Sequence, residues 1–325
     1  MSFTPSPQQA DAIRAIVDWF QNRTHQQQVF RLFGYAGSGK STVITYAIQA
    51  IGTDVAAGDD EEDAARRRIL FAAFTGKAAL VMTRKGTPAS TIHSLIYRVS
   101  EATPEEIDRV ERDLLDLQRG LGRMGPAERA FAEMQISKLQ LRLADIHKPT
   151  FLLNEQSLVR DADLIVLDEV SMVGPEMAAD LLAFGKPILV LGDPGQLPPI
   201  KGTGAFTEAK PDVMLTEIHR QAGESAIIRL ATMARQGIDI PPGEHDAHVW
   251  KLPRNAVRPE QMLRGGQVIC GRNDTRRWLN SQIKQAAGFP APYPAGQDEK
   301  LICLKNRHDL GLVNGMFLAL AEIRH

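Results

Sequence analysis

A glycine-rich turn between a short apolar run and a helical pattern constrains the fold more than any other feature of the chain. The run at residues 29–33 has the length of a buried strand, and residues 40–51 return to helical spacing before Gly52. Between them, residues 34–42 read G-Y-A-G-S-G-K-S-T and fit the pattern G-x-x-x-x-G-K-[ST]. Backbone N–H groups of such a turn can surround an anion at the positive end of the next helix. We therefore predict a phosphate-binding loop, for which a chance glycine turn is the alternative.

The residue types of this loop predict ATP and Mg²⁺ as its ligands. Lys40 would reach the β- and γ-phosphates, and the Ser41 hydroxyl would hold Mg²⁺. The other residues expected to surround the phosphates are Gly34, Gly37, Ser38, Gly39 and Thr42.

Three further apolar runs predict a parallel sheet. They lie at residues 69–74, 164–167 and 188–191, and each is followed by polar or small residues and then by a helical pattern. Strands that alternate with helices are typical of parallel α/β folds, where ligands lie at the carboxyl ends of the strands. The polar motifs of this chain fall at those ends.

Two carboxylates follow the run at 164–167. In a nucleotide hydrolase one carboxylate enters the Mg²⁺ shell and another orients and deprotonates the attacking water, and we assign these roles to Asp168 and Glu169. An acidic strand end is weak evidence alone, and the phosphate-binding loop upstream makes it specific. The third strand end, residues 192–199, reads G-D-P-G-Q-L-P-P, which by itself would be a glycine and proline turn.

Two regions stand apart from this alternating pattern. Residues 98–160 form a charged insertion in which Thr103, Pro104 and Glu106 have the form of a helix start, and we expect a helical hairpin there. After residue 215 we expect a second α/β unit, with helices at 226–234 and 276–287 and strands at 268–270 and 301–304.

Composition mainly argues against certain classes of protein. The net charge of −1 gives no electrostatic argument for nucleic acid, although it does not exclude a narrow basic groove. The two cysteines, Cys270 and Cys303, have no metal-binding spacing and are expected to be reduced thiols. No apolar run approaches the roughly 18 residues of a membrane span, and residues 1–10 do not form a secretion signal. We expect a cytoplasmic protein with no membrane partner.

Taken in order, these segments resemble the motifs of superfamily 1 DNA helicases. The matching segments are residues 34–42 (motif I), 74–79 (motif Ia), 90–95 (motif Ib), 168–173 (motif II), 192–199 (motif III) and 216–221 (motif IV). The sequences T-G-K-A-A, S-T-I-H-S-L and G-D-P-G-Q-L-P-P are similar to the RecD-like, superfamily 1B branch. The resemblance covers about residues 3–100 and 150–221, and more loosely 266–318.

The resemblance implies an α/β fold of the P-loop NTPase type. It would comprise a RecA-like parallel sheet at 1–214 with the helical insertion at 98–160, followed by a partial second RecA-like domain at 215–325. The implied activity is Mg²⁺-ATP hydrolysis coupled to 5′ to 3′ movement on single-stranded DNA.

The resemblance also implies roles for single residues. Gln196 would sense the γ-phosphate, Arg220 would reach it across a domain interface, and Gln9, or alternatively Gln8, would read adenine. Contacts with single-stranded DNA are implied for Thr75, Gly76, Lys77, Ser90, Thr91, His93, Pro198 and Pro199.

Ordinary structural roles remain open for several of these residues. Thr75 and Lys77 could cap and charge a helix start, His93 could be a core histidine, and Arg220 could form a surface ion pair. Phe151 or Leu152, near the end of the insertion, could act as a strand-separating wedge, although packing in a core is the commoner role.

Two other functions compete with the helicase hypothesis. A PhoH-like ATPase acting on RNA has similar strand-end motifs but no second motor domain. The family also carries motif V (H-K-x-Q-G type) and motif VI (T-R-A type), and neither occurs before His325. This predicts a fragment of a longer protein, or a truncated module that binds ATP and DNA without turnover.

Overall fold

The computed structural model describes most of the chain. The described residues are 4–24, 26–53, 68–100, 102–146, 150–197, 199, 203–218, 225–264, 266–289, 298–304, 310–312 and 314–321. Within them, no helix is long and apolar enough to cross a membrane.

Six strands form one parallel sheet, in the order β3-β2-β6-β7-β1-β8. The strands are β1 (Val29–Gly34), β2 (Ile69–Ala73), β3 (Ala89–Thr91), β6 (Leu164–Asp168), β7 (Ile188–Gly192) and β8 (Val213–Leu215). The strands predicted at 69–74, 164–167 and 188–191 are thus confirmed as β2, β6 and β7. Because β7 lies between β1 and β6, the loops that follow these three strands emerge side by side. The α/β fold of the P-loop NTPase type is confirmed.

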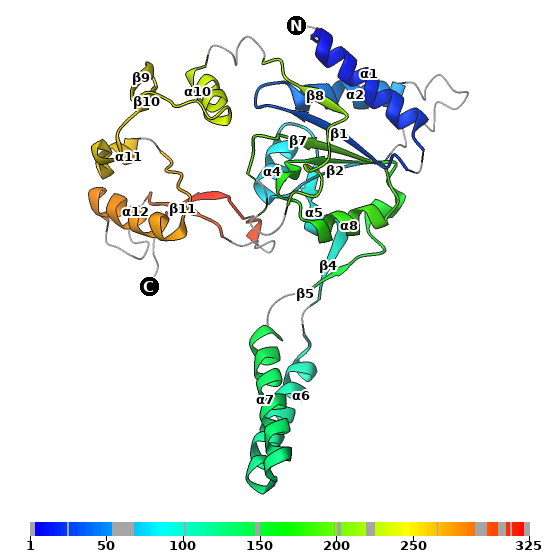
Figure 1. Cartoon of the computed structure of the whole chain (residues 1–325), viewed down its shortest axis with the longest axis vertical. Coiled ribbons are helices and arrows are strands. Elements are labelled where there is room, and N and C mark those ends of the chain that lie inside the picture. The colour runs from blue at the N-terminus through cyan, green and yellow to red at the C-terminus, as the bar shows by residue number, and fades with distance from the viewer. Residues whose placement is uncertain are drawn as a thin grey trace.

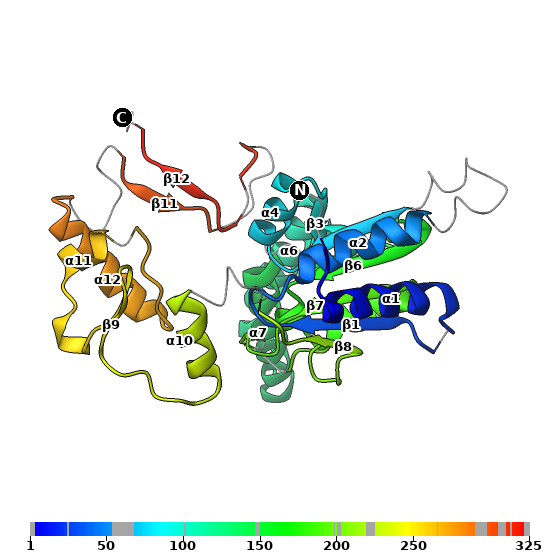
Figure 2. The ribbon, with the colours of Figure 1, turned by 90° about the horizontal axis from the view of Figure 1, so that it is seen from above.

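Helices cover both faces of this sheet (Figure 1 and Figure 2). They are α1 (Pro7–Asn22), α2 (Lys40–Thr53), α4 (Gly76–Arg84), α5 (Ile92–Ile96) and α8 (Pro175–Ala183), with the short 3₁₀ turns η2 (Leu158–Asp161) and η3 (Val170–Met172).

Side chains of the central strands alternate between two hydrophobic clusters. In β6, Leu164 and Val166 pack with residues of α1 and α2, whereas Ile165 and Leu167 pack with residues of α5 and α8. All four are fully buried. Burial on both faces explains why the central strands are continuous apolar runs in the sequence.

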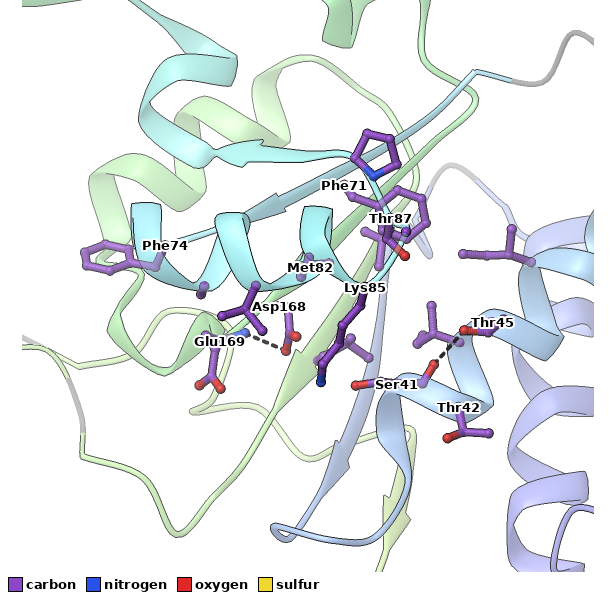
Figure 3. Close-up of a pocket in the computed structure, with 18 of the residues that line it drawn as sticks. Ser41, Thr42, Thr45, Phe71, Phe74, Met82, Lys85, Thr87, Asp168 and Glu169 are labelled. Carbon is purple, nitrogen blue, oxygen red and sulfur yellow. Dashed lines mark hydrogen bonds between the residues drawn. The ribbon is translucent and has the colours of Figure 1, made fainter. Parts of the chain in front are cut away.

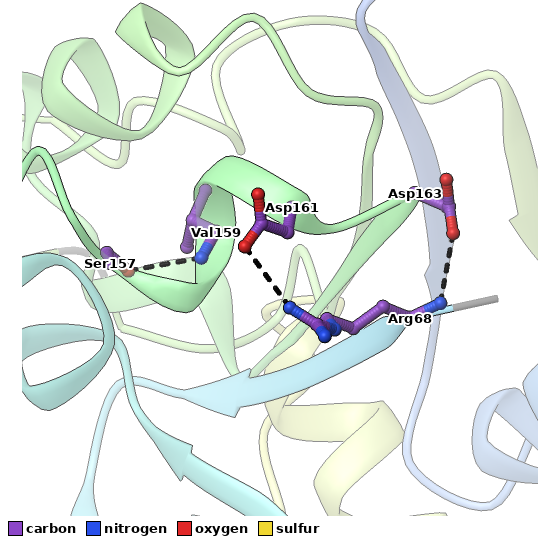
Figure 4. A network of polar contacts seen from close by, with 5 residues as sticks. All are labelled: Arg68, Ser157, Val159, Asp161 and Asp163. Carbon is purple, nitrogen blue, oxygen red and sulfur yellow. Dashed lines mark hydrogen bonds and ion pairs between the residues drawn. The ribbon is translucent and has the colours of Figure 1, made fainter. Parts of the chain in front are cut away.

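Arg68 fixes the start of β2 beside the segment that leads into β6 (Figure 4). Its backbone N–H donates to Asp163 Oδ2 at 2.9 Å, and its guanidinium donates to Asp161 Oδ2 at 3.2 Å. The ion pair is exposed and would contribute about 0–1 kcal/mol, so its effect is on register more than on stability. The preceding residues Arg66 and Arg67 lie outside the described residues.

The insertion protrudes from the sheet as a stalk (Figure 1). A two-stranded antiparallel ribbon, β4 (Tyr97–Ser100) and β5 (Thr150–Leu153), leads to α6 (Pro104–Gly120), η1 (Leu121–Arg123) and α7 (Pro126–Ile146). Thr103 and Glu106 form a capping box at the start of α6, as the sequence indicates. The core position expected for Phe151 and Leu152 is wrong. The two residues are 51% and 41% exposed, because the ribbon lies outside the main sheet.

The residues after β8 form smaller elements beside the carboxyl ends of the sheet (Figure 2). They are α10 (Ala226–Arg235), β9 (Gly243–Asp246), β10 (Val249–Lys251), η4 (Arg254–Ala256), α11 (Pro259–Arg264), α12 (Asn273–Ala286), β11 (Lys300–Ile302) and β12 (Phe317–Ala319). The described strands of this part pair only as antiparallel hairpins, β9 with β10 and β11 with β12. The partial second RecA-like domain therefore stays a prediction, and the predicted boundary at 214/215 falls inside β8.

One strand prediction in this part is wrong. Residues 268–270 do not pair with another strand, and the Ile269 side chain is 92% exposed. An apolar run alone cannot form a strand without a neighbour to accept its backbone hydrogen bonds.

Candidate active site

The loop after β1 has the conformation that its glycines predict. Gly37 and Gly39 both have a φ of 82°, a left-handed region that glycine adopts without strain. A Cβ added at Gly34 would lie 2.5 Å from Ser38 Oγ and 2.9 Å from Leu215 Cβ, so only glycine fits there. The Ser38 side chain is buried, and its hydroxyl donates to the Tyr35 carbonyl at 2.8 Å. The sequence thus folds this segment into a tight cradle before α2.

The Lys40 ammonium lies within this cradle. Its Nζ donates to the carbonyl oxygens of Gly34 at 2.6 Å and Tyr35 at 3.2 Å. Lys40 is also the first residue of α2, so its charge adds to the partial positive charge of that helix N-terminus. The cradle and helix together are suited to bind phosphate groups.

The two carboxylates after β6 differ in environment. Asp168 is partly buried, and its Oδ1 accepts the backbone N–H of Glu169 at 2.8 Å (Figure 3). Burial raises the pKa of Asp168, while the Glu169 N–H and the charges of Lys40 and Lys85 act in the opposite direction. Glu169 is exposed and has a φ of 56°, an uncommon left-handed conformation for a residue with a side chain. This turn ends the strand abruptly and lets the two carboxylates take different roles.

Gln196 connects the loops after β6 and β7. Its Oε1 accepts the hydroxyl of Ser171, a buried residue of η3, at 2.9 Å. Because the oxygen is held in this way, the amide NH₂ is the group that Gln196 can offer to a phosphate oxygen. Ser171 was not selected as a site residue from the sequence, although it lies two residues after Glu169 in the segment 168–173.

A cavity of about 1050 Å³ opens between α2 and α4 at this edge of the sheet. Seven of the residues selected from the sequence share this cavity: Ser41, Thr42, Thr75, Lys77, Asp168, Glu169 and Gln196. Lys85, which follows α4, reaches from the opposite wall toward Ser41 and Asp168 (Figure 3). The sequence did not single out Lys85, because a basic residue before a glycine is common at any helix C-terminus.

The oxygen donors in this cavity fit a magnesium ion. Mg²⁺ prefers oxygen ligands and is usually held by one or two carboxylates together with substrate phosphates and water. The Ser41 hydroxyl and the Asp168 carboxylate supply such donors. In the described part of the chain no group of three or more His, Cys, Asp and Glu side chains could hold a metal ion by itself. A bound cation would therefore depend on the nucleotide as well.

The two candidate glutamines at the start of α1 make different contacts. Gln9 is buried, forms a capping box with Ser6, and donates to the Ser38 carbonyl at 3.4 Å. Gln8 is more exposed and bonds the segment after β8, where its Oε1 accepts the N–H groups of Thr216 at 2.9 Å and Glu217 at 3.0 Å. The pattern Ser6-x-x-Gln9 is a capping-box signature that the sequence interpretation overlooked. Adenine recognition by Gln9 stays a prediction.

Several predicted DNA contacts also have structural roles. Thr75 caps α4 by accepting the N–H of Ala78 at 3.2 Å, and Thr91 caps α5 by accepting the N–H of Ser94 at 3.1 Å. Gly76 is the first residue of α4, and Ser90 lies in β3. The capping role considered for Thr75 is therefore present, and DNA binding by these residues stays a prediction.

His93 belongs to an aromatic cluster at the base of the stalk. Its ring centroid lies 6.0 Å from that of Phe74, 5.9 Å from that of Tyr97 and 5.7 Å from that of Phe151. Burial lowers the pKa of His93, so the neutral imidazole is favoured. Its contact with Phe151 links motif Ib to the ribbon of the insertion.

Lys77 lies next to the C-terminal hairpin. Its Nζ is 4.6 Å from the centroid of the Phe317 ring, and Lys300 Nζ is 4.4 Å from the same centroid. Two cations and an aromatic ring are the groups that single-stranded nucleic acid binds.

The structure does not place three of the predicted site residues in the site. Arg220 and Pro198 lie outside the described residues, and Pro199 has no described contact in the site.

Comparisons with known proteins identify the class. Residues 4–240 match the family described as "AAA domain". Since the match spans more than half of the chain, the protein belongs to this family. With the parallel sheet and the loop at 34–42, it is a P-loop protein with a nucleotide-binding site.

One curated relative narrows the resemblance. The ATP-dependent RecD2 DNA helicase of Deinococcus radiodurans is 40% identical over 75 residues, which are 21% of this chain and 10% of the helicase. The resemblance to RecD-like superfamily 1 helicases is confirmed for that segment, and the chain spans only a small part of the relative.

Solved structures with similar folds are more distant. Pif1 helicase from Candida albicans is 17% identical with a TM-score of 0.42, covering 99% of this chain and 69% of that one. AMPPCP-bound DnaA from Aquifex aeolicus is 11% identical with a TM-score of 0.30, covering 74% of this chain and 55% of that one. Because these TM-scores are low, the fold is assigned from this chain's own parallel sheet and phosphate-binding loop, and not from the similar structures.

The raised pKa of Asp168 predicts opposite effects of one substitution on stability and activity. A raised pKa means that folding favours the protonated carboxyl, so this contribution to stability is present at low pH and is lost as the pH rises through the folded-state pKa. Asp168→Asn should therefore raise the free energy of unfolding at about pH 7, and the gain should narrow toward about pH 4, near the unfolded pKa. Metal-dependent ATP hydrolysis should fall by roughly a hundredfold or more.

Urea unfolding at the two pH values measures the first effect. Asp116→Asn, at an exposed aspartate of α6, is the matched control and should show little change at either pH. A variant Asp168→Asn that is less stable than the parent at neutral pH would contradict this account of the site.

Proposed function

We propose that this chain hydrolyses Mg²⁺-ATP and couples the hydrolysis to movement along single-stranded DNA, as the motor region of a RecD-like helicase. The observation that carries the proposal is the shared cavity in which the first turn of α2, directly after the phosphate-binding loop, meets the carboxylates after β6 and the glutamine after β7. The 75-residue similarity to a DNA helicase supports DNA as the partner, and movement from 5′ to 3′ rests on the resemblance alone.

The residues of the site divide the chemistry among them. Water attacks the γ-phosphorus, the bond to the bridging oxygen of ADP breaks, and ADP and phosphate are formed. Glu169 is suited to accept the proton of the attacking water, because its carboxylate lines the cavity and is turned out of the strand. Lys40 neutralises charge on the phosphates, and Gln196 donates to a phosphate oxygen. Bound Mg²⁺ would supply further positive charge to the phosphate oxygens from the side of Ser41 and Asp168.

Helix α4 offers a physical route between ATP and DNA. Thr75 and Lys77 at its start, where the family contacts DNA, and Lys85, which follows its last residue, all line the nucleotide cavity. A nine-residue helix moves as one body, so a shift at the phosphate end would be transmitted to the DNA end.

The competing functions are less well supported. A single-domain PhoH-like ATPase would not need the elements at 225–321, two of which contact the first part through Arg235 with Tyr35 and Phe317 with Lys77. A module that binds ATP and DNA without turnover has the same contacts, and only measured hydrolysis separates it from a motor.

The first test removes the general base. Glu169→Gln should lower kcat for ATP hydrolysis by about 10²–10⁴-fold, because the amide cannot accept the proton, while ATP binding remains within a few-fold. Glu176→Gln, an exposed glutamate at the start of α8, is the matched control and should hydrolyse ATP normally. Equal hydrolysis by the two variants would exclude this role for Glu169.

A second test addresses DNA. Lys77→Ala should weaken binding to single-stranded DNA and reduce the slope of log K against log salt by about 0.7, the loss of one phosphate contact. Arg84→Ala, at the exposed last turn of the same helix, is the control that should leave the slope unchanged. Fluorescence anisotropy with a labelled oligonucleotide at several salt concentrations measures the affinity and the slope for both variants. An unchanged slope for Lys77→Ala would contradict the DNA contact.

A further inference from the structure

Helix α10 ends with an arginine that packs against the phosphate-binding loop. Arg235 is the last residue of α10, and its Cζ lies 3.6 Å from the centroid of the Tyr35 ring. A Cβ added at Gly195 would also lie 3.0 Å from Arg235 Cδ. One side chain from the C-terminal part therefore contacts the loop after β1 and the loop after β7 together.

The contact lies at the phosphate end of the site. The carbonyl of Tyr35 accepts hydrogen bonds from Lys40 Nζ at 3.2 Å and from Ser38 Oγ at 2.8 Å. The Tyr35 backbone and the Lys40 ammonium thus occupy the same end of the loop. Gly195 directly precedes Gln196, whose amide is held by Ser171. Arg235 therefore contacts a neighbour of each group expected to meet the terminal phosphate: Tyr35, whose carbonyl accepts from Lys40, and Gly195, which precedes Gln196.

The chemistry of arginine suits such a position. A guanidinium is always charged and can stack its face on an aromatic ring while its edge still presents N–H donors. Nη2 of Arg235 donates to Thr232 Oγ1 at 3.3 Å, which orients the group within the last turn of α10. A terminal phosphate bound in the loop would bring negative charge toward this guanidinium and strengthen its hold on the loop.

Resting on the proposed function, we propose that Arg235 is a positioning residue that couples the terminal phosphate of a nucleoside triphosphate to the docking of α10. With a triphosphate in the loop, the stack on Tyr35 tightens and α10 is held against the loops after β1 and β7. Without the terminal phosphate, α10 is held less firmly and the C-terminal part can move. Arg235 is distinct from Arg220, for which the family resemblance implies direct contact with the γ-phosphate.

Hydrogen–deuterium exchange of residues 226–235 tests the proposal on the full chain. A non-hydrolysable ATP analogue should slow exchange in α10 by about tenfold in the parent protein, and ADP should slow it much less. Arg235→Ala should lose this protection while its affinity for the analogue stays within a few-fold. Arg229→Ala is the matched control, because Arg229 is exposed on the same helix and donates to the His245 carbonyl instead of contacting the loop.

Two further variants separate positioning from general folding. Tyr35→Phe keeps the ring and should keep the protection, whereas Tyr35→Ala should lose it. The double variant Tyr35→Ala/Arg235→Ala should be no worse than either single variant, since both remove one interaction. Additive losses in the double variant would overturn the proposal.

The outcomes also separate this proposal from the function on which it rests. Binding of the analogue with equal protection of α10 in the parent and Arg235→Ala would overturn the role of Arg235 alone. Binding of the analogue that does not slow exchange in α10 of the parent protein would also overturn the role of Arg235 alone. If the parent binds the analogue no better than Lys40→Ala does, the proposed function fails together with this inference.

Discussion

The nucleotide site depends on the order of three neighbouring strands, β1, β7 and β6. Because the strands are parallel and adjacent, their carboxyl ends bring together Lys40 after β1, Gln196 after β7 and Asp168 after β6. Burial of both faces of the sheet stabilises this arrangement, since α1 and α2 pack on one face and α5 and α8 on the other. The chemistry of the site is in this sense a consequence of packing.

Much of this arrangement could be predicted from the sequence. The central strands are apolar on both faces, so they are visible as continuous runs, and each ends in a polar motif whose chemistry is specific. Helix ends were harder to predict. Helix α1 begins at Pro7, well before its apolar pattern becomes regular, because Ser6 and Gln9 form a capping box there. At 268–270 the apolar pattern predicted a strand that is not formed, since apolar composition does not provide a neighbouring strand.

The remaining features are contacts between segments that are far apart in the sequence. Lys85 enters the cavity because α4 is oriented across it, and Arg235 meets Tyr35 because α10 docks on the loop. Neither residue lies in a recognisable motif, and each has an ordinary explanation as a basic residue near a helix C-terminus. The same holds for Phe317, whose ring is approached by the ammonium groups of both Lys77 and Lys300. Such groups become visible only when the tertiary structure is known.

The central claim is that one site couples DNA to phosphate chemistry. The most direct measurement is the steady-state rate of ATP hydrolysis by this chain with and without single-stranded DNA, with Lys40→Ala as the reference. We expect hydrolysis that single-stranded DNA stimulates and that Lys40→Ala abolishes. A rate that DNA does not change, or that Lys40→Ala retains, would contradict it.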